Sequence, residues 1–144
     1  LGPWISETMK TPDILQENGY KYLLDWCHDD QPTWMKTYGG EILSVPYPQE
    51  LNDIPSIMVR KNSAEQFAKI ITDNFDEMLE QSRQQPLVMG IALHPYIVGQ
   101  PFRLKHLRNA LLHISRKRED IWFTTAGQIA AHIRTINIRT PNVL

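Results

Sequence analysis

Apolar residues recur every three or four positions in two long segments, and polar residues fill the positions between them. The apolar positions of the first segment are Phe67, Ile71, Phe75, Met78 and Leu79, and those of the second, which runs from about 103 to 117, are Leu104, Leu107, Leu111 and Ile114. This spacing places the apolar side chains on one face of an α-helix. We therefore predict two amphipathic helices that bury these faces in a core.

Polar residues mark where two of the helices begin. Ser63 is followed three residues later by Gln66, which predicts a capping box at the start of the first amphipathic helix. Thr125 and Gln128 have the same spacing and predict a last helix that reaches about Arg134.

A shorter helix is predicted near the start of the chain. Thr11 is an N-cap residue, Pro12 suits the first turn, and Asp13 places a negative charge at the positive pole of the helix. Gly19 supplies a C-terminal stop.

Four segments rich in aliphatic and aromatic residues predict strands. They are 20–26, 41–47 after the turn at Gly39 and Gly40, the nearly continuous apolar run 87–93, and the short segment 121–123. The third is typical of a strand with helices on both sheet faces. The alternation of helices and strands indicates an α/β fold with about four mostly parallel strands. Four strands cannot close a barrel, so the prediction is either an open sheet or part of a (β/α) barrel.

His94 is the first candidate functional residue, because it ends the apolar run 87–93 and is followed by Pro95. Ligands of parallel α/β proteins bind at the carboxyl ends of the strands. The alternative is a core histidine whose ring bonds to a backbone carbonyl.

Polar and aromatic residues follow each of the predicted strands. If the strands are parallel, the loops after them meet at one rim and bring carboxylates, an imidazole, amides and aromatic rings together. These loops are 25–32, 46–55, 94–101 and 124–127.

Composition narrows the class of protein. With 15 basic and 16 acidic residues among 144, the chain carries no strong field, so neither nucleic acid nor an anionic membrane surface is an expected partner. There is no apolar stretch of membrane-spanning length. Cys27 is the sole cysteine, which excludes an intrachain disulfide and favours a cytoplasmic location.

Four stretches resemble the polysaccharide deacetylase superfamily, especially its allantoinase-like branch. They are DWCHDDQPTW (25–34), VPYPQELNDIP (45–55), IALHPYIVGQPFR (91–103) and DIWFTTAGQIAAHI (120–133). The resemblance extends from Gly2 to about Ile133 and is to the C-terminal half of these proteins. It implies a distorted (β/α) barrel of the polysaccharide deacetylase type and hydrolysis of non-peptide C–N bonds.

The resemblance also implies roles for individual residues. His94 matches the late histidine of the family, the candidate general acid. Asp25 and Trp26, with Asp29 and Asp30, match the segment that lines the pocket floor and orients the substrate or the histidine.

The residue types suit such a reaction, which needs an activated water, a stabilised oxyanion and a proton delivered to the leaving nitrogen. His94 can deliver that proton, and Asp25 or Asp29 can bond to its other ring nitrogen and fix the tautomer. Each carboxylate, taken alone, is better explained as a helix cap or a turn former.

The other loop residues are candidates for substrate binding. Asn52 and Asp53 can bond to polar N–H and C=O groups of a small substrate, Trp26 and Tyr96 can form the walls of its pocket, and Asp30 lies beside them in the motif.

We expect no complete metal site within this chain, because the aspartate and paired-histidine motifs of the family belong to its N-terminal half. A divalent metal such as Zn is expected only in the full-length protein. His28, Asp29 and His94 could supply three ligands but lack recognised metal spacing. Cys27 beside His28 is better explained as a small packed side chain than as a nucleophile.

The prediction from sequence is a C–N hydrolase that acts on a small amide or cyclic ureide, with His94 as general acid. A carbohydrate de-N-acetylase is the alternative reaction, and a catalytically incompetent barrel fragment that serves as a binding or assembly module is the alternative class. We expect residues 1–134 to form half of a barrel domain and 135–144 an extension. Because the sequence opens on Leu1, we also expect a missing N-terminal half as partner, and the exposed sheet edges predict a homo-oligomer.

Overall fold

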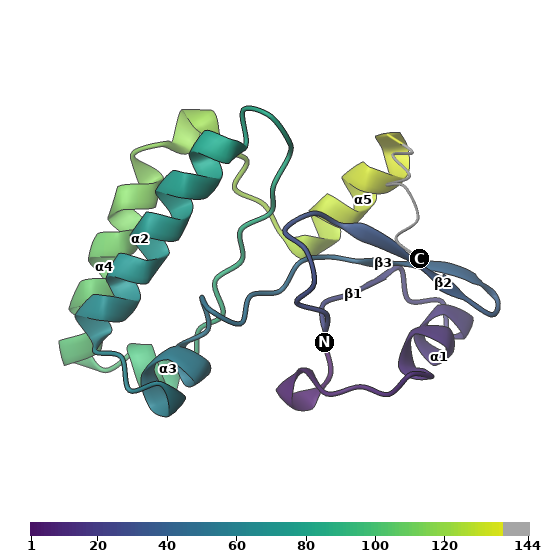
Figure 1. Cartoon of the computed structure of the whole chain (residues 1–144), viewed down its shortest axis with the longest axis horizontal. Helices are drawn as coiled ribbons and strands as arrows, with labels where there is room; N and C mark the ends of the chain where they lie inside the picture. Colours follow the sequence, from purple (N-terminus) through teal and green to yellow (C-terminus); the bar gives the residue numbers. More distant parts are fainter. Residues whose placement is uncertain (137–144) are drawn as a thin grey trace. The chain divides into compact units, whose positions relative to one another are not determined.

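The computed structural model describes residues 1–136, which form two compact units. Unit 1 consists of Leu1–Tyr47 together with the chain from Thr124 onward, and unit 2 consists of Pro48–Phe123. Figure 1 follows the chain from its N-terminal elements, drawn in purple, to its last helix, drawn in yellow.

Unit 1 contains a three-stranded sheet with the order β1-β3-β2. Its strands are β1 (Tyr22–Leu23), β2 (Thr33–Thr37) and β3 (Gly40–Ser44). β1 pairs with β3 in parallel, and β2 pairs with β3 as an antiparallel hairpin in which Thr37 lies opposite Gly40. Gly40 has a φ of 148°, a conformation that glycine adopts readily and other residues rarely do.

Two helices accompany this sheet, α1 (Thr11–Glu17) and α5 (Ala126–Ile136), and Figure 1 draws them on opposite sides of it. Leu43 and Val45 of the β3 segment form a buried cluster with Ala130 of α5. α1 contacts β2 and β3. A short 3-10 turn, η1 (Pro3–Ile5), precedes α1.

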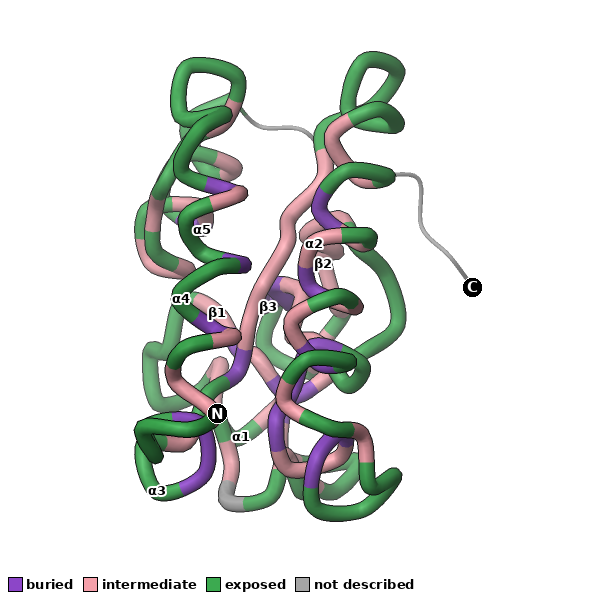
Figure 2. The backbone as a smooth tube through the Cα atoms, turned by 90° about the vertical axis from the view of Figure 1, so that its left-hand side faces the viewer, coloured by how far each residue is buried: buried purple, intermediate pink, exposed green. Residues whose placement is uncertain are grey.

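Unit 2 is built on α2 (Ala64–Gln81) and α4 (Pro101–Ser115), which pack side by side. Buried residues recur about once per turn along α2 (Figure 2), as the sequence period predicts. The core includes Phe67, Ile71, Phe75, Leu107, Ala110 and Ile114. The shorter elements are the π-helix η2 (Ile54–Val59), α3 (Pro95–Val98) and the 3-10 turn η3 (Arg118–Asp120).

The helices predicted from the sequence are confirmed. Ser63 Oγ accepts the N–H of Gln66 at 3.1 Å, and the Gln66 side chain accepts the N–H of Ser63 at 2.7 Å, which completes the predicted capping box. Gly19 has a φ of 80° just beyond α1, as a C-terminal stop requires. One detail of the prediction is wrong, because the N-cap of α1 is Lys10 and not Thr11.

The predicted strands need larger corrections. The predicted segment 20–26 contains β1, although β3 begins one residue before the predicted segment 41–47. β2 was not predicted, and its pairing with β3 makes one of the two strand pairs antiparallel. Neither 87–93 nor 121–123 is a strand in the described structure, and the first contributes a single parallel bridge between Ala92 and Asn52. An extended segment is counted as a strand only where a neighbour completes its ladder of hydrogen bonds. The mixed α/β class is therefore confirmed in coarse form, and the partial barrel stays a prediction.

The predicted division into 1–134 and an extension 135–144 also stays a prediction. α5 continues through residues 135 and 136, and residues 137–144 lie outside the described part of the chain. No helix within residues 1–136 is long and apolar enough to cross a membrane.

Candidate functional site

Two extended segments of unit 2 run side by side and place the candidate histidine. Asn52 and Ala92 form a parallel bridge. The N–H of Ala92 donates to the carbonyl of Leu51 at 2.9 Å, and the N–H of Asp53 donates to the carbonyl of Ala92 at 3.2 Å. Since the chains are parallel here, the residues that follow the bridge on both segments leave it at the same end. Those residues are Asp53 and His94.

The Asp53 carboxylate holds both the backbone and the ring of His94. Oδ2 accepts the His94 N–H at 2.7 Å, and Oδ1 lies 2.6 Å from the His94 Nδ1. Asp53 is completely buried, whereas the His94 side chain retains 35% of its exposure. A buried carboxylate is stable only when donors replace its water, and here one residue supplies two of them.

Local structure leaves the Asp53 side chain available for this contact. Asp53 is the N-cap residue of η2, but its side chain does not cap that helix. The neighbouring Asn52 does so instead, because its Oδ1 accepts the N–H of Ile54 at 3.1 Å. His94 is in turn the N-cap residue of α3, and Pro95 needs no hydrogen-bond acceptor at the first position of that helix.

One aromatic ring, that of Tyr96, contacts the partly exposed His94 side chain. The ring of Tyr96 meets the imidazole edge to face, with 5.8 Å between the ring centroids. Tyr96 is 65% exposed, and Leu93 is also open to solvent. A ligand can therefore reach the imidazole beside an aromatic wall.

The Asp53 contact determines which ring nitrogen of His94 can do chemistry. An ionised carboxylate only accepts hydrogen bonds, so Nδ1 carries a proton and donates it to Asp53. Nε2 is then the nitrogen that can gain or release a proton. Asp53 also compensates the positive charge that the ring carries when both nitrogens are protonated.

This geometry corrects one detail of the expected site. The carboxylate bonded to His94 Nδ1 is Asp53, which we predicted to bind substrate, and not Asp25 or Asp29. The physical reason is the bridge between Asn52 and Ala92, which brings the two segment ends together.

The remaining candidates lie in unit 1. Asp25 is 8% exposed, and its Oδ1 accepts the N–H of Gly2 at 2.6 Å. Asp29 Oδ1 accepts the N–H of Gln31 at 2.9 Å and so forms a local turn. Asp30 is exposed, and Trp26 is half-buried, with its ring edge to face against His28. The catalytic or binding roles of these residues stay predictions.

Glu7, which sequence reasoning missed, lies near Asp25 and Trp26 in unit 1. Burial and the negative charge of Asp25 raise the pKa of the Glu7 carboxyl, and the nearby Trp26 indole offsets part of this rise. Glu7 follows η1 in an irregular segment, so no period or cap signal could have indicated it.

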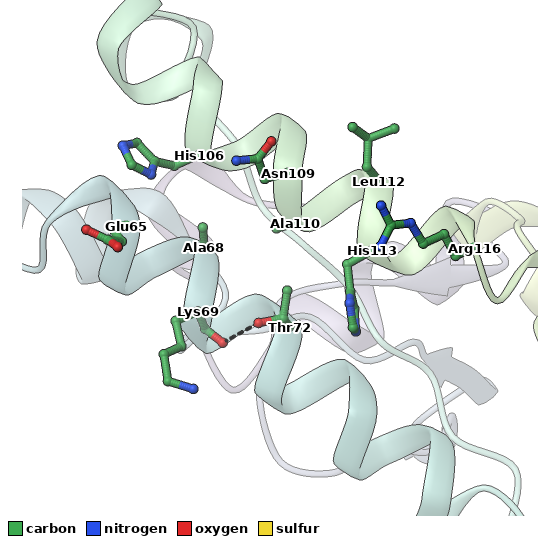
Figure 3. Close-up of a pocket in the computed structure, with 10 residues that line it drawn as sticks. All are labelled: Glu65, Ala68, Lys69, Thr72, His106, Asn109, Ala110, Leu112, His113 and Arg116. Carbon is green, nitrogen blue, oxygen red and sulfur yellow. Dashed lines mark hydrogen bonds between the residues drawn. The ribbon is translucent and has the colours of Figure 1, made fainter.

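A groove of about 430 Å³ opens between α2 and α4 in unit 2 (Figure 3). Its lining includes Glu65 and Lys69 of α2 and His106 and His113 of α4, but neither His94 nor Asp53. Lys69 pairs with Asp73, and His113 Nε2 lies 2.7 Å from Asp76 Oδ1. The groove is thus a polar surface separate from the histidine site, and His106 and His113 are both partly exposed.

Metal ligation is not supported by the residues that the structure describes. Within residues 1–136, no three His, Cys, Asp or Glu residues form a group that could hold a metal ion. The ligand set considered from the sequence is divided between the two units, with His28 and Asp29 in unit 1 and His94 in unit 2. We therefore derive no chemical step through a metal.

The sequence matches no protein-family model and no curated protein. It is nevertheless similar in structure to solved deacetylase-type proteins. The allantoinase PuuE superposes with a TM-score of 0.77 and 27% sequence identity, over 85% of this chain and 41% of its own.

Two further structures, both assigned as polysaccharide deacetylases, are similar as well. The protein from Pseudomonas aeruginosa PAO1 has a TM-score of 0.73 and 28% identity, over 85% of this chain and 41% of its own. The protein from Mycobacterium smegmatis has a TM-score of 0.77 and 24% identity, over 99% of this chain and 50% of its own. The chain thus spans half or less of the length of the structures it resembles. The likeness to an allantoinase and to polysaccharide deacetylases, first indicated by four motifs, is confirmed at the level of structure.

Proposed function

We propose that this chain, with its structural likeness to an allantoinase and to polysaccharide deacetylases, forms part of a hydrolase that cleaves a non-peptide C–N bond. The observation that carries the proposal is the pairing of a half-exposed imidazole with a fully buried carboxylate, His94 with Asp53. Histidines oriented in this way by a carboxylate are typical of acid–base catalysis.

In the proposed mechanism His94 is the general acid. Asp53 fixes the proton on Nδ1 and stabilises the doubly protonated ring, which carries its second proton on Nε2. As the C–N bond breaks, Nε2 delivers that proton to the leaving nitrogen, which would otherwise depart as an unstable anion. The buried position of Asp53 strengthens its interaction with the ring, because little solvent screens the pair.

Unit 1 supplies the remaining proposed groups. Asp25 and Asp29 are candidates for a second catalytic carboxylate, and Trp26 and Asp30 for substrate binding, as the motif resemblance implies. In the full-length protein, a divalent metal such as Zn would be bound by residues outside this chain.

A small cyclic ureide is the proposed substrate class, since the resemblance favours the allantoinase-like branch. A carbohydrate de-N-acetylase is the alternative reaction. A binding or assembly module is the alternative from another class, because the chain spans at most half of the enzymes' length.

The proposal is tested with His94→Asn in the whole protein. The Nδ2 of asparagine occupies the position of the imidazole Nδ1 and can still donate to Asp53, but the residue has no group at the position of Nε2. We expect kcat for a cyclic ureide to fall by about 10²- to 10⁴-fold. The melting temperature should stay close to that of the wild type, because Asp53 keeps a donor.

His113→Asn is the matched control, because a ring nitrogen of His113 also lies 2.7 Å from an aspartate, Asp76, but this aspartate is exposed whereas Asp53 is buried. It should leave kcat unchanged. Full turnover by His94→Asn would refute the assigned role. A wild-type protein that hydrolyses an N-acetylated sugar instead of the ureide would favour the de-N-acetylase, and hydrolysis of neither would favour the binding module.

A further inference from the structure

The two long helices of unit 2 carry opposite charge. α2 contains five acidic side chains and one basic side chain, whereas α4 contains three basic side chains and no acidic one. Three further basic residues, 116–118, follow α4 directly, and no acidic residue lies between Glu80 and Glu119. The chain as a whole has a net charge of −1, so this separation of charge is a local property of the helix pair.

The charged side chains lie on the solvent side of the two helices. Each helix buries one apolar face in the core of unit 2, and charged residues follow the helical period on the opposite face. We call this surface the outer face. Its exposed charged residues include Glu65, Asp73 and Glu80 of α2 and Lys105, Arg108 and the C-cap residue Arg116 of α4.

The basic side chains of the outer face lack acidic partners. Within residues 1–136, none of the three on α4 forms an ion pair, whereas Asp73 and Glu80 pair only with basic residues on or next to α2. The two helices run side by side in the same direction (Figure 1). The groove between them is lined by Glu65 and Arg116, so an acidic row and a basic row border one open surface.

Two large apolar side chains are exposed among the basic ones. Leu112 is 52% exposed, lies between Arg108 and Arg116 along α4 and also lines the groove. Phe102, in the first turn of α4, is 67% exposed. A stable interface needs such apolar contact, because exposed ion pairs alone contribute little. The outer face offers both apolar contact and charge.

The charge pattern selects the kind of partner. A nucleic acid or an acidic protein would bind the basic row but would be repelled by the acidic row beside it. A partner that fits must present both rows in exchanged positions. A second copy of this chain does so when it is turned by 180° about an axis parallel to the helices, because this rotation keeps the helix direction and exchanges α2 with α4.

We infer that the outer face binds the same face of a second copy of this chain, with α2 of each copy against α4 of the other. The acidic row then meets the basic row twice. Because both copies use the same surface, the contact closes on itself and gives a dimer. Packing α4 on α4 would instead place like charges opposite each other.

Charge reversal on one helix at a time tests this dimer in the full chain by sedimentation velocity. One variant makes α4 acidic and carries Lys105→Glu, Arg108→Glu and Arg116→Glu. The other makes α2 basic and carries Glu65→Lys, Asp73→Lys and Glu80→Lys. All six side chains are exposed, so both variants should fold. We expect each variant alone to self-associate at least about tenfold more weakly than the wild type, because like charges then face each other.

An equimolar mixture of the two variants should associate about as tightly as the wild type, since the acidic α2 of one then meets the basic α4 of the other and their two reversed helices also attract. Raising the salt concentration from about 0.1 M to about 1 M should weaken the wild-type dimer, because the Debye length falls from about 10 Å to about 3 Å.

The control reverses three exposed basic residues that lie outside both helices, with Lys10→Glu, Lys21→Glu and Arg60→Glu. It changes the net charge as much as the variant with the acidic α4 does, and it should self-associate like the wild type. Self-association that survives both helix variants would assign the contact to another surface, such as the sheet edges, and overturn the inference. A wild type that is monomeric at every concentration, or a mixture that does not associate, would overturn it as well.

Discussion

Two carboxylates of this chain, Asp53 and Glu7, lie in different surroundings. Asp53 accepts two hydrogen bonds from His94 and has no exposed surface, so its charge is compensated where it lies. The Glu7 oxygens are shielded from solvent, and the carboxylate lies near the negative charge of Asp25 and the indole of Trp26. Burial and the charge of Asp25 oppose ionisation of the Glu7 carboxyl.

This difference predicts how stability depends on pH at Glu7. Its pKa in the folded protein is raised above the ordinary value of 4.5 by burial and by Asp25, so the folded state binds the proton more tightly than the unfolded chain. Stability is therefore lost as the pH rises from 4.5 through the folded pKa. Glu7→Gln, which cannot ionise, should melt at a higher temperature than the wild type at neutral pH, and the gain should vanish below pH 4.5.

Thermal melts of both proteins across this range check the prediction. Glu17→Gln should show no comparable gain, because Glu17 is exposed. A Glu7→Gln protein that melts below the wild type at neutral pH would mean that the ionised carboxylate is stabilised by a partner.

At the scale of elements, α2 and α4 provide the framework of unit 2. Their facing residues, with Phe67 and Ile71 among the most buried, form one core with Leu51 and Ile97. Leu51 directly precedes the bridge that places Asp53, and Ile97 lies in α3, directly after His94. The helix pair thus anchors both segments that carry the candidate site.

The capping box of α2 gives a direct test of this framework. Ser63→Ala removes the acceptor for the Gln66 N–H, and we expect a loss of about 1 kcal/mol in the free energy of unfolding. Chemical denaturation measures it. Ser82→Ala at the other end of α2 is the control, because its hydroxyl donates only to the exposed Leu79 carbonyl, and it should change stability by less than about 0.5 kcal/mol.

At the scale of the whole chain, both outer strands of the unit 1 sheet are edges within that unit. β3 is paired on both sides, whereas β1 and β2 each have one partner in the described structure. Unpaired edges invite pairing with another chain. This supports the expectation of a homo-oligomer or of a companion barrel segment.

Sedimentation velocity of the chain at increasing concentration checks this expectation. We predict that the mean sedimentation coefficient rises with concentration as edges pair. A single monomeric species over the whole range would contradict self-association and leave the companion segment as the remaining candidate partner.

The sequence by itself determined the helices and the presence of the candidate imidazole. The period of Phe67, Ile71 and Phe75 and the cap at Ser63 depend on neighbours within a few positions, so they can be read from local sequence. His94 was identified because a long apolar run ends there. The four motifs indicated a likeness that the solved structures confirm.

Only the tertiary structure decided which segments pair and which carboxylate meets His94. A strand requires a partner that is distant in the sequence, so the apolar run 87–93 could form one bridge and no ladder, while the more polar β2 formed a hairpin with β3. Asp53 is 41 residues from His94, and nothing local distinguishes it from Asp25 or Asp29. The contact exists because two parallel segments end together, and that arrangement is a property of the folded chain.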